Sequence, residues 1–141
     1  MATRSSVSNL PFRVGRSRTG LGLFAVAPIK KGSFIAEYWG KLILTKTADD
    51  RNSKYLFEIN SRWTVDGADR RNVARYINHS CRPNAQTYIV KHTIKIRALK
   101  TIKPGQEITY NYGRNYFDTF IKPIGCKCTA CGKKKLNGAK Y

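Results

Sequence analysis

A short run in the middle of the chain, from Arg75 to Asn84, places the strongest constraint on the fold. It reads Arg-Tyr-Ile-Asn-His-Ser-Cys-Arg-Pro-Asn and crowds short polar side chains around one His, one Cys and one Pro. This composition is typical of an irregular segment that is buried or contacts a ligand. A second run, Glu107 to Gly113, is apolar and aromatic and follows a Lys-Pro-Gly-Gln turn. It predicts a strand whose last residues reach a site.

The rest of the chain predicts short strands joined by turns. A length of 141 residues with 41% hydrophobic residues allows one domain with a modest core and argues against disorder. Eleven Gly and five Pro favour a turn-rich β protein over a helical bundle. From residue 92 to 98, apolar residues alternate with polar ones, which predicts a strand with one face in water. We therefore expect a mostly β fold of several small sheets with short helical turns.

Turn residues and apolar runs also predict where the other elements lie. We expect a loose N-terminal arm over residues 1–11, a folded domain over 12–118 and a cysteine-rich basic tail over 119–141. Within the domain, the patterns predict a glycine turn in 16–25, a strand in 34–40, a helical turn in 45–53, a hairpin from 55–59 and 63–66, a helical turn in 70–75 and a strand in 86–90.

The charge of the chain is strongly unbalanced. Twenty-seven Lys and Arg against eight Asp and Glu give a formal net charge of +19. Such a field attracts nucleic acid, although a generally basic, soluble surface explains the composition equally well. The basic residues do not follow one amphipathic helix, which disfavours a lipid surface, and no stretch approaches the ~20 apolar residues of a membrane span. We find no signal peptide in the first residues and expect a reducing compartment.

The four cysteines predict a metal site. Three of them lie within six residues of the tail, close enough to hold one ion, but a closed tetrahedral site needs a fourth ligand. We expect one structural zinc ion that uses every cysteine and fastens the tail to the central segment. Two alternatives stay open: a buried central Cys with a tail cluster that binds metal by itself or oxidises, and two disulfides if the protein is exported. The predicted ligands are Cys81, Cys126, Cys128 and Cys131.

Five motifs in this order resemble the SET-domain lysine methyltransferases. They are the opening turn Thr19-Gly-Leu-Gly22, Glu37-Tyr-Trp-Gly40, Asn78-His-Ser-Cys-Arg-Pro-Asn84, Glu107-Ile-Thr-Tyr-Asn-Tyr112, and the cysteine tail. The resemblance covers residues 13 to 132 and implies a minimal SET domain with a short post-SET tail. Its β-fold of small curved sheets would bring the two central motifs past each other in a pseudoknot-like crossing. The tail departs from the family's Cys-x-Cys-x4-Cys spacing, because its second gap has two residues.

The same resemblance implies that the cofactor is S-adenosylmethionine. Glycine positions admit a ligand close to the backbone, and Asn and His side chains offer hydrogen bonds to its polar ends. The His79 ring has a second interpretation, in which it closes a local hydrogen-bond network, and we do not assign it as a general base. The residues implied for cofactor binding are Thr19, Gly20, Leu21, Gly22, Arg75, Asn78 and His79.

Three tyrosines are implied at the reacting amine. A free lysine titrates near ~10.4, so the substrate must lose its proton before methyl transfer, and a desolvated channel lined by tyrosines disfavours the ammonium form. The resemblance places Tyr112 at the methyl group and Tyr38 along the same channel. Tyr110 falls where the family carries a Phe or Tyr that limits the number of methyl groups, and Tyr implies one or two. Tyr55, Tyr76 and Tyr88 are expected to pack at strand ends.

The expected function is S-adenosylmethionine-dependent N-methylation of lysine in a histone or another basic, nucleic-acid-associated protein. The net charge would repel such a substrate and attract DNA beside it, so we expect DNA contact through the basic surface. The alternative is a basic chromatin- or nucleic-acid-binding module with an inactive pocket. The expected location is the nucleus or chromatin in a eukaryotic cell or host, and otherwise the cytoplasm.

The short insert between Gly40 and Arg75 holds five of the eight acidic residues. They can form a groove for a cationic peptide, or they can simply solvate a loop. They are Asp49, Asp50, Glu58, Asp66 and Asp69.

Overall fold

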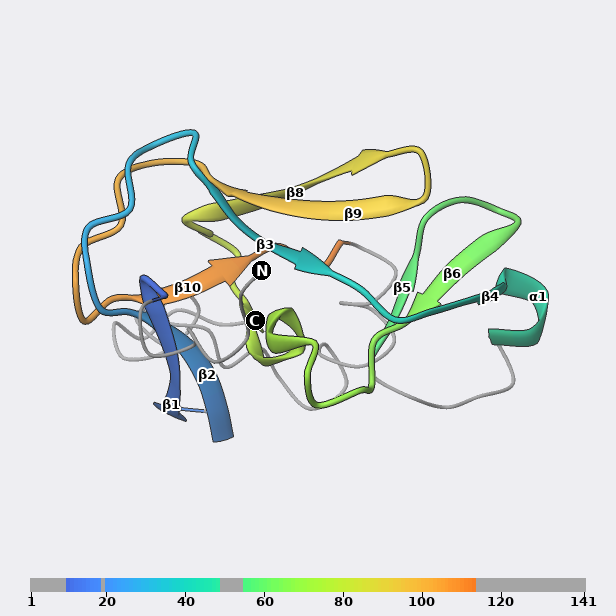
Figure 1. The fold of residues 1–141 in the computed structure, drawn as a ribbon, viewed down its shortest axis with the longest axis horizontal. Helices are drawn as coiled ribbons and strands as arrows, with labels where there is room; N and C mark the ends of the chain where they lie inside the picture. The colour runs from blue at the N-terminus through green and yellow to red at the C-terminus, as the bar shows by residue number, and fades with distance from the viewer. Residues whose placement is uncertain (1–9, 19, 49–54, 114–141) are drawn as a thin grey trace, which may run out of the picture.

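The structure is a computed structural model that describes residues 10–18, 20–48 and 55–113. Within these ranges it contains ten short strands, one turn of α-helix and one turn of 3-10 helix, arranged in three small sheets (Figure 1). This confirms the expected mostly β fold of several small sheets. The predicted arm and tail, Thr19, Asp49 and Asp50 lie outside the described residues. No helix in the described ranges is long and apolar enough to cross a membrane.

The first sheet contains the two central motifs. Its strands are ordered β1 (Phe12–Ser17), β2 (Gly20–Ala25), β10 (Glu107–Tyr110) and β7 (Asn78–His79). β1 and β2 form the antiparallel hairpin expected at the glycine turn, and β10 pairs antiparallel with β2. On its other side, β10 pairs parallel with β7. Two segments about thirty residues apart in the chain, roughly the span of a crossover unit, are therefore neighbours in one sheet.

The second and third sheets are antiparallel and lie away from β1. The second contains β3 (Phe34–Tyr38), β9 (Thr93–Ala98) and β8 (Ala85–Val90), and β8 and β9 form the hairpin along the top of Figure 1. The third contains β4 (Lys41–Leu44), β6 (Trp63–Asp66) and β5 (Leu56–Glu58). The helical turn α1 (Thr45–Ala48) follows β4 directly in the chain. Figure 1 shows the third sheet and α1 at the end of the molecule opposite β1 and β2.

The core lies where the sheets meet. In β9 the buried side chains are Ile94, Ile96 and Ala98, which confirms the alternation predicted for this strand. Ile94 and Ile96 join Leu23 of β2 and Ile108 of β10 as fully buried side chains. Burial of each large aliphatic side chain stabilises a fold by about 1.5–3 kcal/mol, so this shared cluster is what holds the small sheets together.

Two local details differ from the sequence expectation. The helical turn predicted over residues 70–75 occurs as the 3-10 turn η2 (Val73–Tyr76). It begins later because Asp69 Oδ1 accepts the backbone N–H of Arg71 at 2.9 Å, which forms a side-chain turn before the helix. The central segment was expected to be irregular, yet Asn78 and His79 form the short strand β7. The strand β7 forms by pairing with β10, which is distant in the chain, so no local sequence pattern predicts it.

Candidate active site

The two central motifs are held in register where they pass each other. β7 pairs with β10 through Thr109 opposite Asn78 and Tyr110 opposite His79. Asn84 extends this contact, because its Nδ2 donates to the carbonyl oxygen of Glu107 at 2.8 Å and its Oδ1 accepts the N–H of Thr109 at 2.9 Å. The amide side chain thus adds hydrogen bonds between the central segment and β10 beyond the two residue pairs of β7 and β10. This meeting of the two motifs is the crossing that the resemblance implied.

Asn78 ties the glycine turn to this crossing. Its Nδ2 donates to the carbonyl oxygen of Leu21 at 2.9 Å and to Oε2 of Glu107 at 2.7 Å, with Ser17 Oγ at 3.1 Å. A Cβ on Gly22 would lie 2.5 Å from Glu107 Oε2, so a side chain there would displace the carboxylate that accepts from Asn78. Gly20 has a φ of +121°, and a Cβ there would meet nothing within 4 Å. The structure therefore brings together four predicted cofactor residues: Gly20, Leu21, Gly22 and Asn78.

Arg75 lies on η2, which packs against β2 and β3. Its guanidinium carbon lies 4.2 Å from the ring centre of Tyr55 and 5.2 Å from that of Tyr76, so two aromatic rings stabilise the charge by cation–π contact. Its Nε is buried and has no hydrogen-bond partner among the described residues. An unsatisfied buried donor costs about 1–3 kcal/mol, and an acceptor on a bound ligand would relieve that cost.

The predicted tyrosines belong to one row of aromatic rings. Ring centres are 5.4 Å apart for Tyr38 and Phe57, 6.4 Å for Phe57 and Tyr110, 5.1 Å for Tyr110 and Tyr112, and 5.4 Å for Tyr112 and His79. Three sheets contribute to this aromatic row. Phe57 of β5 completes it and was not singled out from the sequence, where its only signal is its place in a short apolar run.

Backbone carbonyls accept the hydroxyls at two points of the aromatic row. Tyr38 donates its hydroxyl to the carbonyl oxygen of Tyr55 at 2.7 Å, and Tyr112 donates to the carbonyl oxygen of Ile77. Tyr38 and Tyr110 are buried, while Tyr112 is only partly buried at the end of the row. The arrangement offers a wall of aromatic rings that ends at the partly buried Tyr112, which suits a long side chain with a polar tip.

His79 closes a local network at this end of the row. Its Nδ1 accepts the backbone N–H of Tyr112 at 3.1 Å, and its Nε2 lies 3.4 Å from Cys81 Sγ. Burial lowers the pKa of His79, which favours the neutral ring. An accepting Nδ1 assigns the proton of that neutral ring to Nε2. The ring therefore has the network role that the sequence left open as its second interpretation, and its predicted contact with cofactor stays a prediction.

A buried asparagine that the sequence did not reveal supports Tyr38. Asn72 is fully buried, its Oδ1 accepts the N–H of Trp39 at 3.2 Å, and its Nδ2 donates to the carbonyl oxygen of Gly67 at 3.0 Å. A Cβ on Gly67 would overlap the Tyr38 ring and lie 2.7 Å from Asn72 Nδ2. The close approach of these residues fixes the position of the Tyr38 ring. Nothing in the local pattern distinguishes this Asn from a turn residue.

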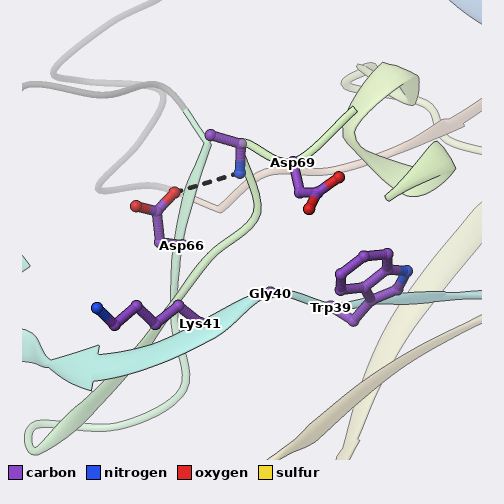
Figure 2. Close-up of a pocket in the computed structure, with 6 residues that line it drawn as sticks. Trp39, Gly40, Lys41, Asp66 and Asp69 are labelled. Atoms are coloured by element: carbon purple, nitrogen blue, oxygen red, sulfur yellow. Dashed lines mark hydrogen bonds between the residues drawn. The ribbon is translucent and has the colours of Figure 1, made fainter. Parts of the chain in front are cut away.

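Two of the insert's acidic residues border an open surface hollow of about 410 Å³ (Figure 2). Its lining includes Trp39, Lys41, Asp66 and Asp69. Both carboxylates are engaged within the chain: Asp66 Oδ1 accepts the N–H of Ala68 at 3.2 Å, and Asp69 pairs with Arg71 at 2.7 Å. The hydrogen bonds from Arg71 lower the pKa of Asp69 to about 2. These contacts favour the loop-solvating interpretation for this pair.

Cys81 is the one predicted zinc ligand among the described residues, where it lies exposed just after the buried Ser80. The described ranges contain no group of three or more His, Cys, Asp or Glu side chains that could hold a metal ion. The other three predicted ligands are Cys126, Cys128 and Cys131, and they lie outside those ranges.

Comparison with known proteins agrees with this geometry. Residues 20–113 match the model of the SET domain, and the chain belongs to the SET-domain family. It is 35% identical over 135 residues to the histone-lysine N-methyltransferase mes-4 of Caenorhabditis elegans, covering 79% of this chain and 15% of that protein. It is 34% identical over 158 residues to the histone-lysine N-methyltransferase ASHH3 of Arabidopsis thaliana, covering 96% and 43%.

A solved structure supports the same family. The chain is similar, with a TM-score of 0.67 and 35% identity, to a chain in the crystal structure of the Chaetomium thermophilum polycomb repressive complex 2. The match covers 75% of this chain and 16% of that one. The chain thus spans less than half the length of the curated relatives and the solved chain described here.

Proposed function

We propose that this protein is an S-adenosylmethionine-dependent protein-lysine N-methyltransferase that acts on a histone or another basic, nucleic-acid-associated protein. The observation that carries the proposal is the meeting of the aromatic row with the crossing of the two central motifs. It brings Tyr112 beside His79, and Asn78, which precedes His79 in β7, donates to Leu21 of the glycine turn. The relatives named above are histone-lysine N-methyltransferases, which supports a histone-like substrate.

The residues around the glycine turn fit the cofactor. The open, positive-φ position of Gly20 leaves room beside the backbone, and the buried Nε of Arg75 has no acceptor among the described residues, which a bound group could supply. S-adenosylmethionine, when bound, supplies an electrophilic methyl group on a sulfonium. Gly20, Leu21, Gly22, Arg75 and Asn78 would hold it, with the predicted Thr19 and His79 completing the set.

The aromatic row prepares the substrate amine. Its rings remove water from the lysine side chain, and desolvation disfavours the charged ammonium relative to the neutral amine that reacts. The hydroxyl oxygen of Tyr112 can accept a hydrogen bond from that amine while its proton is donated to Ile77. Tyr38, fixed by Asn72 and Gly67, lines the inner part of the channel. Positioning of the amine is the main contribution such a site can make.

Methylation of mixed histones with labelled cofactor tests the proposal. We expect label in a histone lysine, and a loss of about 100-fold or more in rate for Tyr112→Phe, the size seen when a group that stabilises developing charge is removed. Tyr88→Phe, on β8 outside the aromatic row, is the matched control. Absence of label from folded protein, or full activity in Tyr112→Phe, would contradict the proposal. The first outcome together with salt-dependent DNA binding would favour the inactive binding module.

We further propose that Tyr110 limits the product to one or two methyl groups. Tyr110 is 4% exposed and its ring lies against Tyr112, so its hydroxyl would fix water in the space that a larger methylated amine needs. Tyr110→Phe should raise the number of methyl groups per lysine in mass spectra of the product. An unchanged methyl count in an active Tyr110→Phe enzyme would remove this role.

The domain limits and the zinc site complete the proposal. The SET domain would span residues 12–118, after an arm over 1–11, and the tail over 119–141 would be clamped by one structural zinc held by Cys81, Cys126, Cys128 and Cys131. Metal analysis of the purified full chain should find one zinc ion, and Cys81→Ser should release it. We propose action at chromatin in the nucleus, following the histone substrate.

A further inference from the structure

Two loops far apart in the chain are joined along one end of the molecule. Residues 26–33 connect β2 to β3, and residues 99–106 connect β9 to β10. Figure 1 shows them side by side at the end opposite the third sheet. We refer to them as the paired loops. Because they lie away from β5, they contribute no residue to the aromatic row.

Backbone hydrogen bonds fix the paired loops at three levels. Ile29 and Ile102 exchange two bonds of 2.9 and 2.8 Å, as in an antiparallel strand pair. Nearer the second sheet, Ala98 accepts the N–H of Gly32 at 2.8 Å and donates to Ser33 at 2.9 Å. Two further bonds of 2.9 and 2.8 Å join Ala25 to the other end of the second loop. The paired loops are therefore a ridge of fixed register.

Four lysines are carried on this ridge. Lys30, Lys31 and Lys100 lie between the bonds at Ile29–Ile102 and those at Ala98, and Lys103 follows directly after Ile102. All four are exposed and form no ion pair with any described residue. Neither loop contains an Asp or Glu. The ridge thus presents four cations without a neutralising carboxylate of its own.

Three of the five acidic residues in the described ranges lie far from the ridge, while Glu37 is exposed on β3, four residues after the first of the paired loops. Glu58, Asp66 and Asp69 belong to the third sheet or the loop after it, at the opposite end of the molecule (Figure 1). Glu107 follows the second of the paired loops, but its carboxylate accepts from Asn78 in the crossing. At physiological ionic strength charges are screened over about 8 Å, so carboxylates at the far end do not offset the field at the ridge.

This arrangement fits a polyanion. The lysine ammonium groups repel one another because the fixed backbone keeps them close together. A bound polyanion removes this repulsion, and it also releases the counterions that surrounded its own negative charges. Single-stranded nucleic acid is usually held by rows of exposed aromatic rings, whereas Phe34, 58% exposed, is the one large exposed aromatic beside the ridge in the described ranges. We propose that the paired loops are a docking surface for the backbone phosphates of duplex DNA.

Such docking would act separately from methyl transfer. DNA neutralises the field that repels a basic substrate, and it holds the enzyme where proteins that package DNA are concentrated. The inference therefore adds a partner and a surface to the proposed function without using any residue of the candidate active site.

The test compares two full-length variants with the same change in charge. One replaces the ridge lysines: Lys30→Gln, Lys31→Gln, Lys100→Gln and Lys103→Gln. The control makes four exposed substitutions in or beside the third sheet: Lys41→Gln, Lys46→Gln, Arg62→Gln and Arg70→Gln. Binding to a short labelled duplex is followed by fluorescence anisotropy over a series of salt concentrations, without cofactor or peptide. Circular dichroism and unfolding curves establish that both variants fold.

The expected result is a selective loss in the ridge variant. Each phosphate contact contributes about 0.9 to the slope of log affinity against log salt, so loss of four contacts should lower that slope by about 3 to 4. The control should change it by less than about 1. Equal loss in both variants, or no loss in the ridge variant, would overturn the proposal, as would tighter binding of single-stranded DNA or polyglutamate than of duplex. Methylation of a free peptide reports on the proposed activity independently.

Discussion

The crossing of the central motifs and the third sheet use different means to hold short strands. At the crossing, the side-chain amides of Asn78 and Asn84 bond segments that are distant in the chain, and Ile108 beneath them is fully buried. The third sheet is held by its own strand pairing and keeps Leu42 and Leu44 39% and 44% exposed. Where the site needs fixed geometry, the fold uses specific polar contacts. The third sheet contributes a single ring, Phe57, to the aromatic row, and this ring makes only apolar contacts with Tyr38 and Tyr110.

The largest difference is expected between an asparagine of the crossing and one of the third sheet. Asn78→Ala removes the Nδ2 hydrogen bonds to the partly buried Glu107 carboxylate and to the Leu21 carbonyl, and should lower the free energy of unfolding by about 2–3 kcal/mol. Asn60→Ala removes two bonds to the backbone of its own exposed turn, at Arg62 and Trp63, and should cost about 1 kcal/mol or less. Urea unfolding of both variants checks this. Equal losses would mean that the crossing has no special role in stability.

The next comparison tests Phe57, which the third sheet contributes to the aromatic row. Phe57 is partly buried against Tyr38 and Tyr110, so Phe57→Ala should cost about 2 kcal/mol and lower the rate of methyl transfer. Leu44→Ala, at an exposed position of β4 in the same sheet, should change stability by less than about 0.5 kcal/mol and leave the rate unchanged. Thermal unfolding and initial rates measure both effects. A Phe57→Ala enzyme with normal stability and rate would show that the aromatic row does not need this ring.

A smaller effect is expected from the buried polar contact inside the third sheet. The Thr45 and Thr64 hydroxyls lie 2.9 Å apart, and Thr45 Oγ1 also donates to the carbonyl oxygen of Asn60 at 3.0 Å. Thr64→Val keeps the shape and removes one of these bonds, so it should cost about 1 kcal/mol, less than Asn78→Ala. Chemical denaturation against the wild type measures the difference. A loss as large as that of Asn78→Ala would remove the distinction between the two regions.

The smallest effect is expected from the exposed Asp69–Arg71 pair. The pKa of Asp69 is lowered from 3.8 to about 2 in the folded protein, so its stabilising contribution is present above pH 3.8 and is lost as the pH falls toward about 2. Asp69→Asn should therefore lower the melting temperature slightly near neutral pH and make no difference in strong acid. Because both side chains are exposed to solvent, screening keeps the contribution small. A difference that grows as the pH falls would contradict the assignment.

The sequence by itself determined the elements with a local signal. The alternation of apolar and polar residues along 92–98 predicted β9 and its buried face. The Lys-Pro-Gly-Gln turn predicted that a strand, β10, follows it. The ordered motifs also singled out Tyr38, Tyr110 and Tyr112 before any geometry was known. These features depend on hydrophobic periodicity, turn residues or residue identity, and each of these can be read from a short local stretch of sequence.

Only the tertiary structure decided which segments meet. The parallel pairing of β7 with β10 has no local signal, because two residues cannot display a period and their partner lies about thirty residues away, beyond any local pattern. For the same reason the buried Asn72, the Phe57 contact and the joined lysine loops were absent from the sequence interpretation. Each of these contacts requires a long loop to close, which costs conformational entropy. The free energy gained by burying the shared apolar core offsets that cost, and it arises from the whole chain rather than from any one segment.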